Sequence, residues 1–295
     1  MSNGNKPTVN EHYVPQVYLR GFATDSNPER IYRLSLSNIS AGCKNVKINS
    51  QLVEKNLYEI KTDNNIFIGR NYIEKCFQEK ETLFGEYRSK LFSEIEVCKD
   101  SNQIKYLSKE VRDFFTNFTL LQMVRLARIV KSACNKASDD LNKYTKAYEA
   151  HILTYFKLFP FFDKEKTLPL VGQSMVEEMT PWLNEMVFFA GYFESNILFT
   201  SDNPVFAYID NFDTKEPTEI FFSLSPQCVI IFLHRDENNQ IYDNQIIPLS
   251  NELASHIQIC TIKNAQDALY SSYEFKGEDF AKIEEIRNDR QKYIN

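Results

Sequence analysis

The sequence predicts an α+β fold: short strands near the N-terminus, a central helical block, and a C-terminal, mostly antiparallel sheet with terminal helices. Apolar residues alternate with period two near the start of the chain, recur at helical spacing through its middle, and alternate again in its last third. Strands and helices segregated in this way are typical of α+β folds. Because no internal repeat or flexible linker is present, residues 1–295 are interpreted as a single α+β domain, with residues 1–10 as a flexible tail.

The N-terminal region is expected to hold one short helix and three strands. Residues 14–22 (VPQVYLRGF) have a proline near the first helical position and Gly21 near the end, which is typical of a short helix. Apolar and polar residues alternate in 31–36, 44–48 and 56–60, and this period predicts strands.

The middle of the chain is predicted to be helical, and its last third to be a sheet. Helices are expected at 72–97, 107–131, 139–159 and 174–184 because apolar residues recur there at helical spacing. Strands are expected at 186–193, 197–200, 205–209, 219–222 and 229–234. Three further helices are expected at 250–261, 264–272 and 278–293.

The composition argues against several classes of protein. The chain has eight glycines and no nucleotide-cofactor motif, which disfavours a glycine-rich phosphate loop. A net charge of −6 disfavours sequence-independent coating of nucleic acid but allows a local basic cleft. The N-terminus does not resemble a signal peptide, and no stretch approaches the roughly 20 apolar residues of a membrane span. We therefore expect a cytoplasmic protein that does not contact a membrane.

The cysteines and histidines predict no metal framework. The six cysteines are Cys43, Cys76, Cys98, Cys134, Cys228 and Cys260, and none lies in a CxxC spacing. They are interpreted as free thiols in a reducing compartment. His151, His234 and His256 are interpreted as residues without a role in metal binding.

The first candidate site is the N-terminal HYVPQVYLR segment. Gln16 and Arg20 are four residues apart, so a helix would project both from one side, and His12 precedes that helix by about one turn. A histidine beside an arginine can bind an anion or serve in acid–base chemistry. The alternative is a surface helix whose apolar residues dock on the core.

The second candidate is a pair of carboxylates in the helix expected at 72–97. Glu74 and Glu81 are nearly two turns apart and therefore line one side of that helix. Paired carboxylates can hold Mg²⁺ or Mn²⁺, or act as a base. Taken alone, the pair is also compatible with an ordinary solvated helix face.

The third candidate comes from an interruption in an apolar stripe. Gln122 and Arg125 share one helical stripe with the apolar residues Val111, Phe115, Phe118 and Ile129. A buried guanidinium without a partner would cost roughly 3–5 kcal/mol. Arg125 is therefore predicted to be buried, either in an ion pair with Glu74 or Glu81, or in a pocket wall facing an anionic ligand.

The fourth candidate is the turn Ser201-Asp202-Asn203-Pro204, which follows an apolar strand. Loops at strand ends often hold catalytic carboxylates, and Ser201 and Asn203 would then be polar groups for substrate. The alternative is a purely structural turn, since Asn-Pro disfavours helix and Asp readily bonds nearby backbone. The sequence supports both interpretations equally.

Seven segments carry a resemblance to a known family: HYVPQVYLRGF, EKNLYEI, YIEKCFQEKE, LLQMVRLAR, LFTSDNPVF, IFFSLSPQC and IKNAQDALYSS. The chain resembles the bacterial family named domain of unknown function 4238, nearly end to end, from His12 to about Ser272. The family's motif positions match His12, Pro15, Tyr18, Leu19, Phe22, Glu74, Glu81, Gln122, Arg125, Ser201, Asp202, Asn203, Pro204, Pro226 and Asn264. The resemblance therefore implies a shared site, and it assigns no reaction.

If these residues meet, they would suit an anionic substrate attacked by activated water. Glu74, Glu81 and Asp202 would hold Mg²⁺ or Mn²⁺, Arg20 and Arg125 would neutralise phosphate, and the histidine would move the proton. The leading hypothesis is a hydrolase of a phosphodiester or nucleotide, for example a nuclease-type toxin or defence effector, acting on an anionic small molecule or nucleic acid. The alternative is a non-catalytic ligand-binding or interaction module of a bacterial defence or toxin system.

Overall fold

A six-stranded sheet forms the centre of the fold. The computed structural model describes residues 9–61, 67–68, 71–101, 104–127, 175–211 and 216–292. The strand order is β10-β11-β12-β8-β13-β7, and the pairs are antiparallel except for β13 and β8. These strands are β7 (Lys105–Tyr106), β8 (Val187–Tyr192), β10 (Val205–Asn211), β11 (Glu216–Ser225), β12 (Cys228–Leu233) and β13 (Gln245–Pro248).

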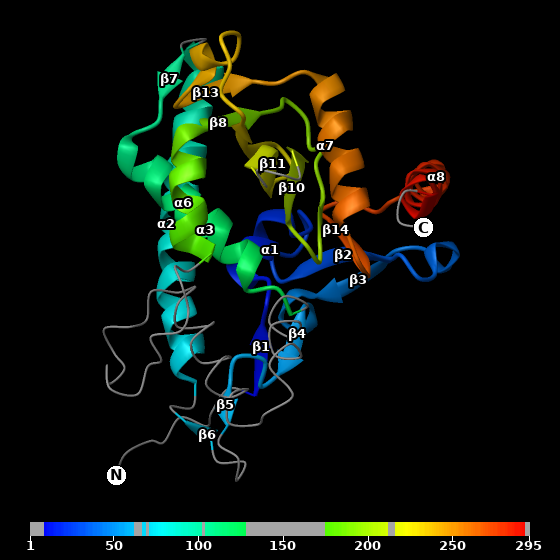
Figure 1. The fold of residues 1–295 in the computed structure, drawn as a ribbon. Coiled ribbons are helices and arrows are strands. Elements are labelled where there is room, and N and C mark those ends of the chain that lie inside the picture. Colours follow the sequence, from blue (N-terminus) through cyan, green and yellow to red (C-terminus); the bar gives the residue numbers. More distant parts are fainter. Residues whose placement is uncertain are drawn as a thin grey trace.

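Helices cover both faces of this sheet (Figure 1). On one face lie α2 (Tyr72–Ser101), α3 (Lys109–Val124) and α6 (Met175–Glu185), and on the other lies α7 (Asn251–Asn264). Alternate residues of the central strands point to the two sides: Phe188 and Phe222 pack with α2 and α3, whereas Phe189 and Phe221 pack with α7. Because both faces are covered, the central strands are apolar at nearly every position.

The aromatic ring of Phe84 fixes α2 against α3 and the sheet. It is fully buried and stacks on Phe118 of α3 with the ring centroids 4.4 Å apart, while Phe222 of β11 lies 6.3 Å away. At the start of α3, the Ser108 side chain accepts a hydrogen bond from the backbone N–H of Val111. The position of α2 is thus set by packing well away from its charged first turns.

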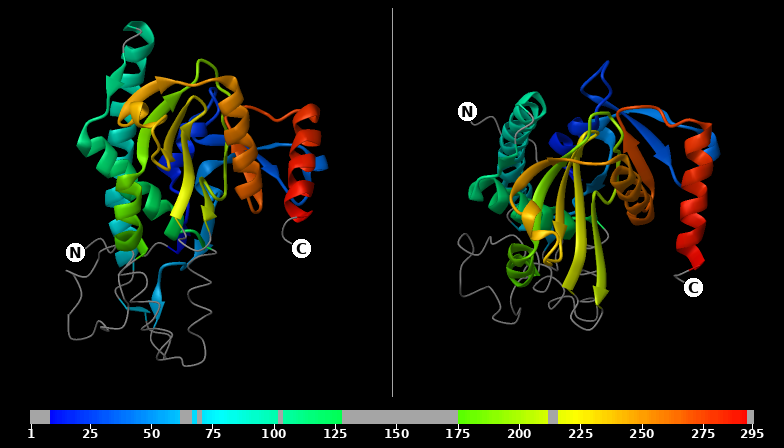
Figure 2. Two further views of the ribbon diagram at one scale, coloured as in Figure 1. Left: turned by 45° about the horizontal axis from the view of Figure 1, so that its top comes forward. Right: turned by 90° about the horizontal axis from the view of Figure 1, so that it is seen from above.

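The N-terminal segment lies between this sheet and the second sheet described below (Figure 2). Strand β1 (Asn10–His12) pairs antiparallel with β4 (Val53–Lys55), and α1 (Gln16–Leu19) continues as a 3₁₀ turn over Arg20–Phe22. The Tyr18 side chain is fully buried, and its hydroxyl lies 2.7 Å from that of Thr200. Two short strands, β5 (Ile60–Lys61) and β6 (Phe67–Ile68), form a separate pair.

A second sheet joins the two ends of the chain. Its order is β3-β2-β14-β9, with the bounds Lys44–Lys47, Arg30–Ser35, Ala268–Ser271 and Thr200–Ser201. The helix α8 (Gly277–Lys292) packs over it through an apolar cluster that includes Leu34, Leu269 and Ile283. None of the helices among the described residues is long and apolar enough to cross a membrane.

The observed fold confirms the predicted α+β class and corrects several boundaries. The helix expected at 264–272 is wrong, because α7 ends at Asn264 and β14 pairs with β2, with Leu269 opposite Leu34. The strand expected at 56–60 is mostly a turn, in which Asn56 has a positive φ of 50°. Strand β1 was missed and begins at Asn10, within the expected tail. The helix expected at 139–159 lies outside the described residues.

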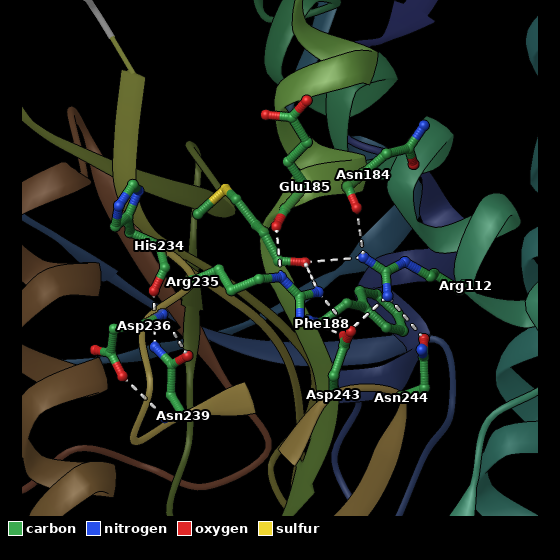
Figure 3. Close-up of polar contacts among 11 residues, drawn as sticks. Arg112, Asn184, Glu185, Phe188, His234, Arg235, Asp236, Asn239, Asp243 and Asn244 are labelled. Carbon is green, nitrogen blue, oxygen red and sulfur yellow. Dashed lines mark hydrogen bonds and ion pairs between the residues drawn. The ribbon is translucent and has the colours of Figure 1, made fainter. Parts of the chain in front are cut away.

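A network around Arg112 fastens α3 to the sheet (Figure 3). Its Nη1 donates to Asp243 Oδ1 at 2.8 Å and to Asn244 Oδ1 at 2.9 Å, and its Nη2 donates to the carbonyls of Asn184 and Met186. Arg235 pairs with the other oxygen of Asp243. The Arg112 and Asp243 side-chain heads are thus hydrogen-bonded, as expected for partly buried charges in a structural role.

Candidate functional site

A second group of polar and ionisable side chains, buried or half-buried, lies where β1, α2 and the C-terminal end of α3 meet. We call it the Arg125 cluster, and it consists of Glu11, His12, Glu74, Glu81, Gln122 and Arg125. Five of these six are candidates predicted from the sequence, and the structure brings them together from three segments of the chain. Unlike the Arg112 network, this group contains polar atoms that no described residue satisfies.

Arg125 lies at the centre of the cluster. Its side chain is 1% exposed, and its Nη2 donates to Glu81 Oε1 at 3.0 Å and to the His12 carbonyl at 2.7 Å. The guanidinium lies over the ring of Phe77, 4.2 Å from the centroid, and the Tyr58 hydroxyl donates to the Arg125 carbonyl at 2.9 Å. The predicted burial and carboxylate pairing of Arg125 are thereby confirmed, with Glu81 as the partner.

Arg125 also has N–H donors that no described residue accepts. The two hydrogens on Nη2 are used, whereas Nε and Nη1 have no hydrogen-bond partner among the residues that the structure describes. An arginine has five N–H donors and stays protonated, so a buried one normally finds an acceptor for each. The free donors are suited to an anion such as phosphate or to ordered water.

His12 presents a neutral acceptor to the same region. The backbone carbonyl of Asn49 hydrogen-bonds to the imidazole, and Nε2 has no partner among the described residues. Burial, reinforced by the positive charges of Arg125 and Arg20, lowers the pKa of His12 from 6.5 to about 4. At neutral pH the ring is therefore uncharged and has a lone pair available.

Two carboxyl groups of the cluster, those of Glu74 and Glu11, have raised pKa values. Burial raises the pKa of Glu74 to about 7, although Arg125 opposes the shift and the neighbouring charges of Glu81 and Glu59 add to it. Burial likewise raises the pKa of Glu11 to about 8, and the nearby charges of Glu59 and Glu74 add to the shift. A carboxyl group that titrates near pH 7 inside a buried cluster is typical of acid–base sites.

Glu11 and Glu59 are members of this carboxylate group that the sequence analysis missed. Glu11 is fully buried and accepts from the backbone N–H of Tyr58 at 2.8 Å, while Glu59 accepts from Asn71. Glu11 falls next to the expected flexible tail, and no periodicity marks it. Glu59 lies in the EKNLYEI segment that carried the family resemblance, which was the available indication.

Gln122 connects the cluster to the N-terminal segment that follows β1. Its Nε2 donates to the Tyr13 carbonyl at 2.9 Å, while Oε1 is buried and has no partner among the described residues. The buried side-chain atoms left in this condition are Glu11 Oε1, His12 Nε2, Asn56 Oδ1, Glu74 Oε2, Thr116 Oγ1, Thr119 Oγ1, Gln122 Oε1, Arg125 Nε and Arg125 Nη1. Five of the eight residues belong to the Arg125 cluster, so the unsatisfied polarity is concentrated there.

The Ser-Asp-Asn-Pro turn is built differently, because its polar groups hold the backbone. The two carboxylate oxygens of Asp202 accept from the backbone N–H groups of Gln266 at 2.9 Å and Asp267 at 2.7 Å. Asn203 and Asn264 bond each other through their side-chain amides, and the Ser201 hydroxyl donates to the Asn203 carbonyl. These contacts support the structural interpretation of the turn and connect β9 to the segment between α7 and β14.

The remaining candidates lie at the surface. Arg20 forms a two-point ion pair with Glu29, at 2.8 and 3.1 Å, and its third side-chain contact is with Gln16 at 3.5 Å. Its side chain is 39% exposed. Gln16 and Arg20 therefore make their described hydrogen bonds outside the cluster, although the charge of Arg20 still contributes to the lowered pKa of His12.

The predicted metal ligands do not form a ready-made set among the described residues. Glu81 Oε1 is engaged by Arg125, and Asp202 holds backbone amides. Within the described ranges, Glu74 Oε2 is the carboxylate atom of the predicted set that is buried without a hydrogen-bond partner. The described residues do bring three potential ligand atoms within 4.8 Å of one another elsewhere, at Glu219, His256 and Cys260.

The raised pKa values of Glu11 and Glu74 predict a pH-dependent stability, with the free energy of unfolding declining from about pH 4.5 to 8. Glu11 and Glu74 keep their protons in the folded state up to about pH 8 and 7, whereas the unfolded chain releases them near 4.5. The stabilisation is therefore complete at low pH and is lost as the pH rises, by up to about 1.36 kcal/mol per pH unit for each proton. His12 has the opposite effect, confined to pH values below 6.5.

Chemical denaturation of Glu11→Gln across this pH range measures the contribution of Glu11. Glutamine imitates the protonated carboxyl and does not titrate, so the variant should gain stability relative to the wild type as the pH rises. Glu79→Gln, an exposed residue on the same helix as Glu74, should leave the slope unchanged. Equal slopes for wild type and Glu11→Gln would show that Glu11 is not protonated in the folded protein.

Comparison with known proteins places the chain in a family without naming a reaction. No curated protein and no solved structure matches it. One family model matches residues 10–274, which include every residue of the Arg125 cluster and of the Ser-Asp-Asn-Pro turn. The chain therefore belongs to the family described as Protein of unknown function (DUF4238).

Proposed function

We propose that the protein is a hydrolase of a phosphodiester or nucleotide, and that the Arg125 cluster is its active site. The observation that carries this proposal is the concentration, around one buried arginine, of polar atoms of complementary chemistry that have no partner among the described residues. The free N–H groups of Arg125 suit phosphate oxygens, and Nε2 of His12 and Oε2 of Glu74 suit protons in transfer. The Glu81 side chain is 22% exposed, so the cluster meets solvent at that residue.

In this proposal the two titratable groups have opposite roles. His12, neutral at pH 7, takes the proton of the attacking water as the new phosphorus–oxygen bond forms. Glu74, with a pKa of about 7, gives its proton to the leaving oxygen as the old bond breaks. Arg125 neutralises the charge that develops on the phosphoryl oxygens, and Gln122 positions the substrate through Oε1, which no residue in the described part of the chain engages.

The proposal also includes a divalent metal ion, because carboxylate oxygens are suitable ligands for Mg²⁺ and Mn²⁺. In a metal-dependent form of the reaction, a deprotonated Glu74 would instead hold a Mg²⁺ or Mn²⁺ ion through Oε2, and water would protonate the leaving oxygen. Such an ion would add Lewis-acid stabilisation of the phosphoryl oxygens. Asp202 is left out of this set because its oxygens bind backbone amides, and it is proposed as a structural residue.

The test uses the purified full chain and a panel of phosphate esters. The panel contains a chromogenic phosphodiester, the corresponding monoester, nucleoside triphosphates, single-stranded DNA and RNA, each with Mg²⁺, with Mn²⁺ or with EDTA. We expect hydrolysis of one class, and a fall in kcat/KM of about 10²–10⁴-fold for Glu74→Gln or His12→Gln. The matched controls Glu79→Gln and His234→Gln change exposed residues of the same types and should retain activity.

A second function is favoured by the way Arg125 bridges β1, α2 and α3. Those contacts would also suit a non-catalytic module that binds an anionic ligand or a protein of a bacterial defence or toxin system. If no ester is cleaved under any metal condition while nucleotides still raise the melting temperature, the binding module replaces the hydrolase. Location in the cytoplasm is proposed with either function, because Cys98, Cys228 and Cys260 are free thiols.

A further inference from the structure

We propose that Glu219, His256 and Cys260 form a zinc-binding site between β11 and α7. His256 and Cys260 are four residues apart on α7, so they project from the same side of the helix. Glu219 reaches them from β11, which lies beside α7 (Figure 1). This site lies outside the Arg125 cluster and does not depend on the function proposed above.

The two distances from His256 to the other ligand atoms match those of a tetrahedral zinc site. His256 Nε2 lies 3.2 Å from Glu219 Oε1 and 3.7 Å from Cys260 Sγ. Zinc bonds of about 2.0–2.1 Å to nitrogen and oxygen and 2.3 Å to sulfur place such atoms roughly 3.3 and 3.6 Å apart at tetrahedral angles. All three atoms lie within 4.8 Å of one another, so an ion would fit with little movement of the helix or strand.

The surroundings hold this geometry in place. The edge of the His256 imidazole contacts the ring of Phe221, with the two planes 88° apart and the centroids 5.6 Å apart. Cys260 is buried in the apolar cluster beneath α7, which fixes the position of its sulfur. Burial, with the charge of Glu219, raises the pKa of the Cys260 thiol to about 12, while the positive charge of Lys263 opposes the shift.

The donor set selects the metal and its coordination. One sulfur, one imidazole nitrogen and one carboxylate oxygen suit zinc, whereas magnesium and calcium prefer oxygen alone. Three protein ligands leave the fourth position for water or an external ligand. The His256 side chain is 49% exposed, so that position faces solvent.

Binding requires one change of protonation and no redox step. The S–H bond of Cys260 breaks as the zinc–sulfur bond forms, and the proton passes to solvent. The imidazole binds in its neutral form and the carboxylate as the anion. One proton should therefore be released for each zinc ion bound by the thiol form of the protein.

The experiment titrates Zn²⁺ into chelator-stripped full chain in competition with a chromogenic chelator, and Co²⁺ into a second sample. We expect one Zn²⁺ per chain, a rise in melting temperature of several degrees, and a thiolate-to-cobalt charge-transfer band. Titration calorimetry in two buffers of different ionisation enthalpy should give a release of one proton. His256→Gln and Cys260→Ser should each weaken zinc binding by about 10- to 100-fold.

Matched controls separate this site from adventitious zinc. His234→Gln changes an exposed histidine, and Cys43→Ser changes a cysteine outside the site; both should bind zinc like the wild type. His256 is exposed, so His256→Gln should fold even if Cys260→Ser does not. Absence of the charge-transfer band, or equal zinc affinity for wild type and His256→Gln, would overturn the proposal.

Discussion

Arg125→Ala should lower the free energy of unfolding by about 3–5 kcal/mol, since it breaks a buried ion pair from one side. The change leaves Glu81 without its partner, removes the donor to the His12 carbonyl and empties the space over the Phe77 ring. β1, α2 and the end of α3 would then lose their shared polar contact. Urea denaturation at pH 7, with the m-value compared between proteins, measures the loss.

Two further substitutions determine why the loss occurs. Arg125→Met fills the volume and keeps a contact with the Phe77 ring, so it should cost less than alanine if packing and the buried charge dominate. Arg20→Ala removes an exposed arginine that also pairs with a glutamate, and should cost no more than about 1 kcal/mol. If Arg125→Ala costs as little as Arg20→Ala, the cluster does not hold these elements together.

Asp202→Ala should also be strongly destabilising, by about 1.5–3 kcal/mol for each of the two hydrogen bonds that it removes. The backbone N–H groups of Gln266 and Asp267 lose a charged acceptor in a place where the Asp202 side chain is 5% exposed. The start of β14 lies against this turn, because the Asp202 N–H donates to the carbonyl of Ala268, the first residue of that strand. Thermal and urea denaturation should both report the change.

The control for this prediction is Asp236→Ala. Asp236 also accepts two backbone N–H groups, those of Asn238 and Asn239, but at an exposed turn where water can replace it. Its loss should cost about 1 kcal/mol or less. Asp202→Asn, which keeps the shape and loses the charge, should lower stability while folded molecules retain any hydrolytic activity. Loss of activity from a fully folded Asp202→Asn protein would return Asp202 to the proposed active site.

The elements confirmed from the sequence are those whose apolar pattern is strong and local. The α2 and α3 helices were expected because their apolar residues recur every three or four positions, and β8 and β12 because their short apolar runs are flanked by turn residues. Strand β14 was mistaken for a helix because it has four residues and owes its conformation to pairing with β2, far away in the sequence. Strand β1 depends in the same way on β4.

The residues of the candidate site likewise fall into those that the local sequence predicted and those that only long-range contacts placed. By itself, the sequence determined that Arg125 would be buried and would need an anionic partner, either a carboxylate or a ligand, because an unpaired charge on an apolar helical stripe is costly. Only the tertiary structure decided that Glu81 is the partner, that Glu11 and Glu59 join the carboxylates, and that Asp202 turns toward backbone amides. Local periodicity fixes which side of an element faces the core, but hydrogen-bond partners come from segments brought together by folding. The distance between Glu219 and His256, 37 residues apart in the chain, is set by the same long-range packing of β11 against α7.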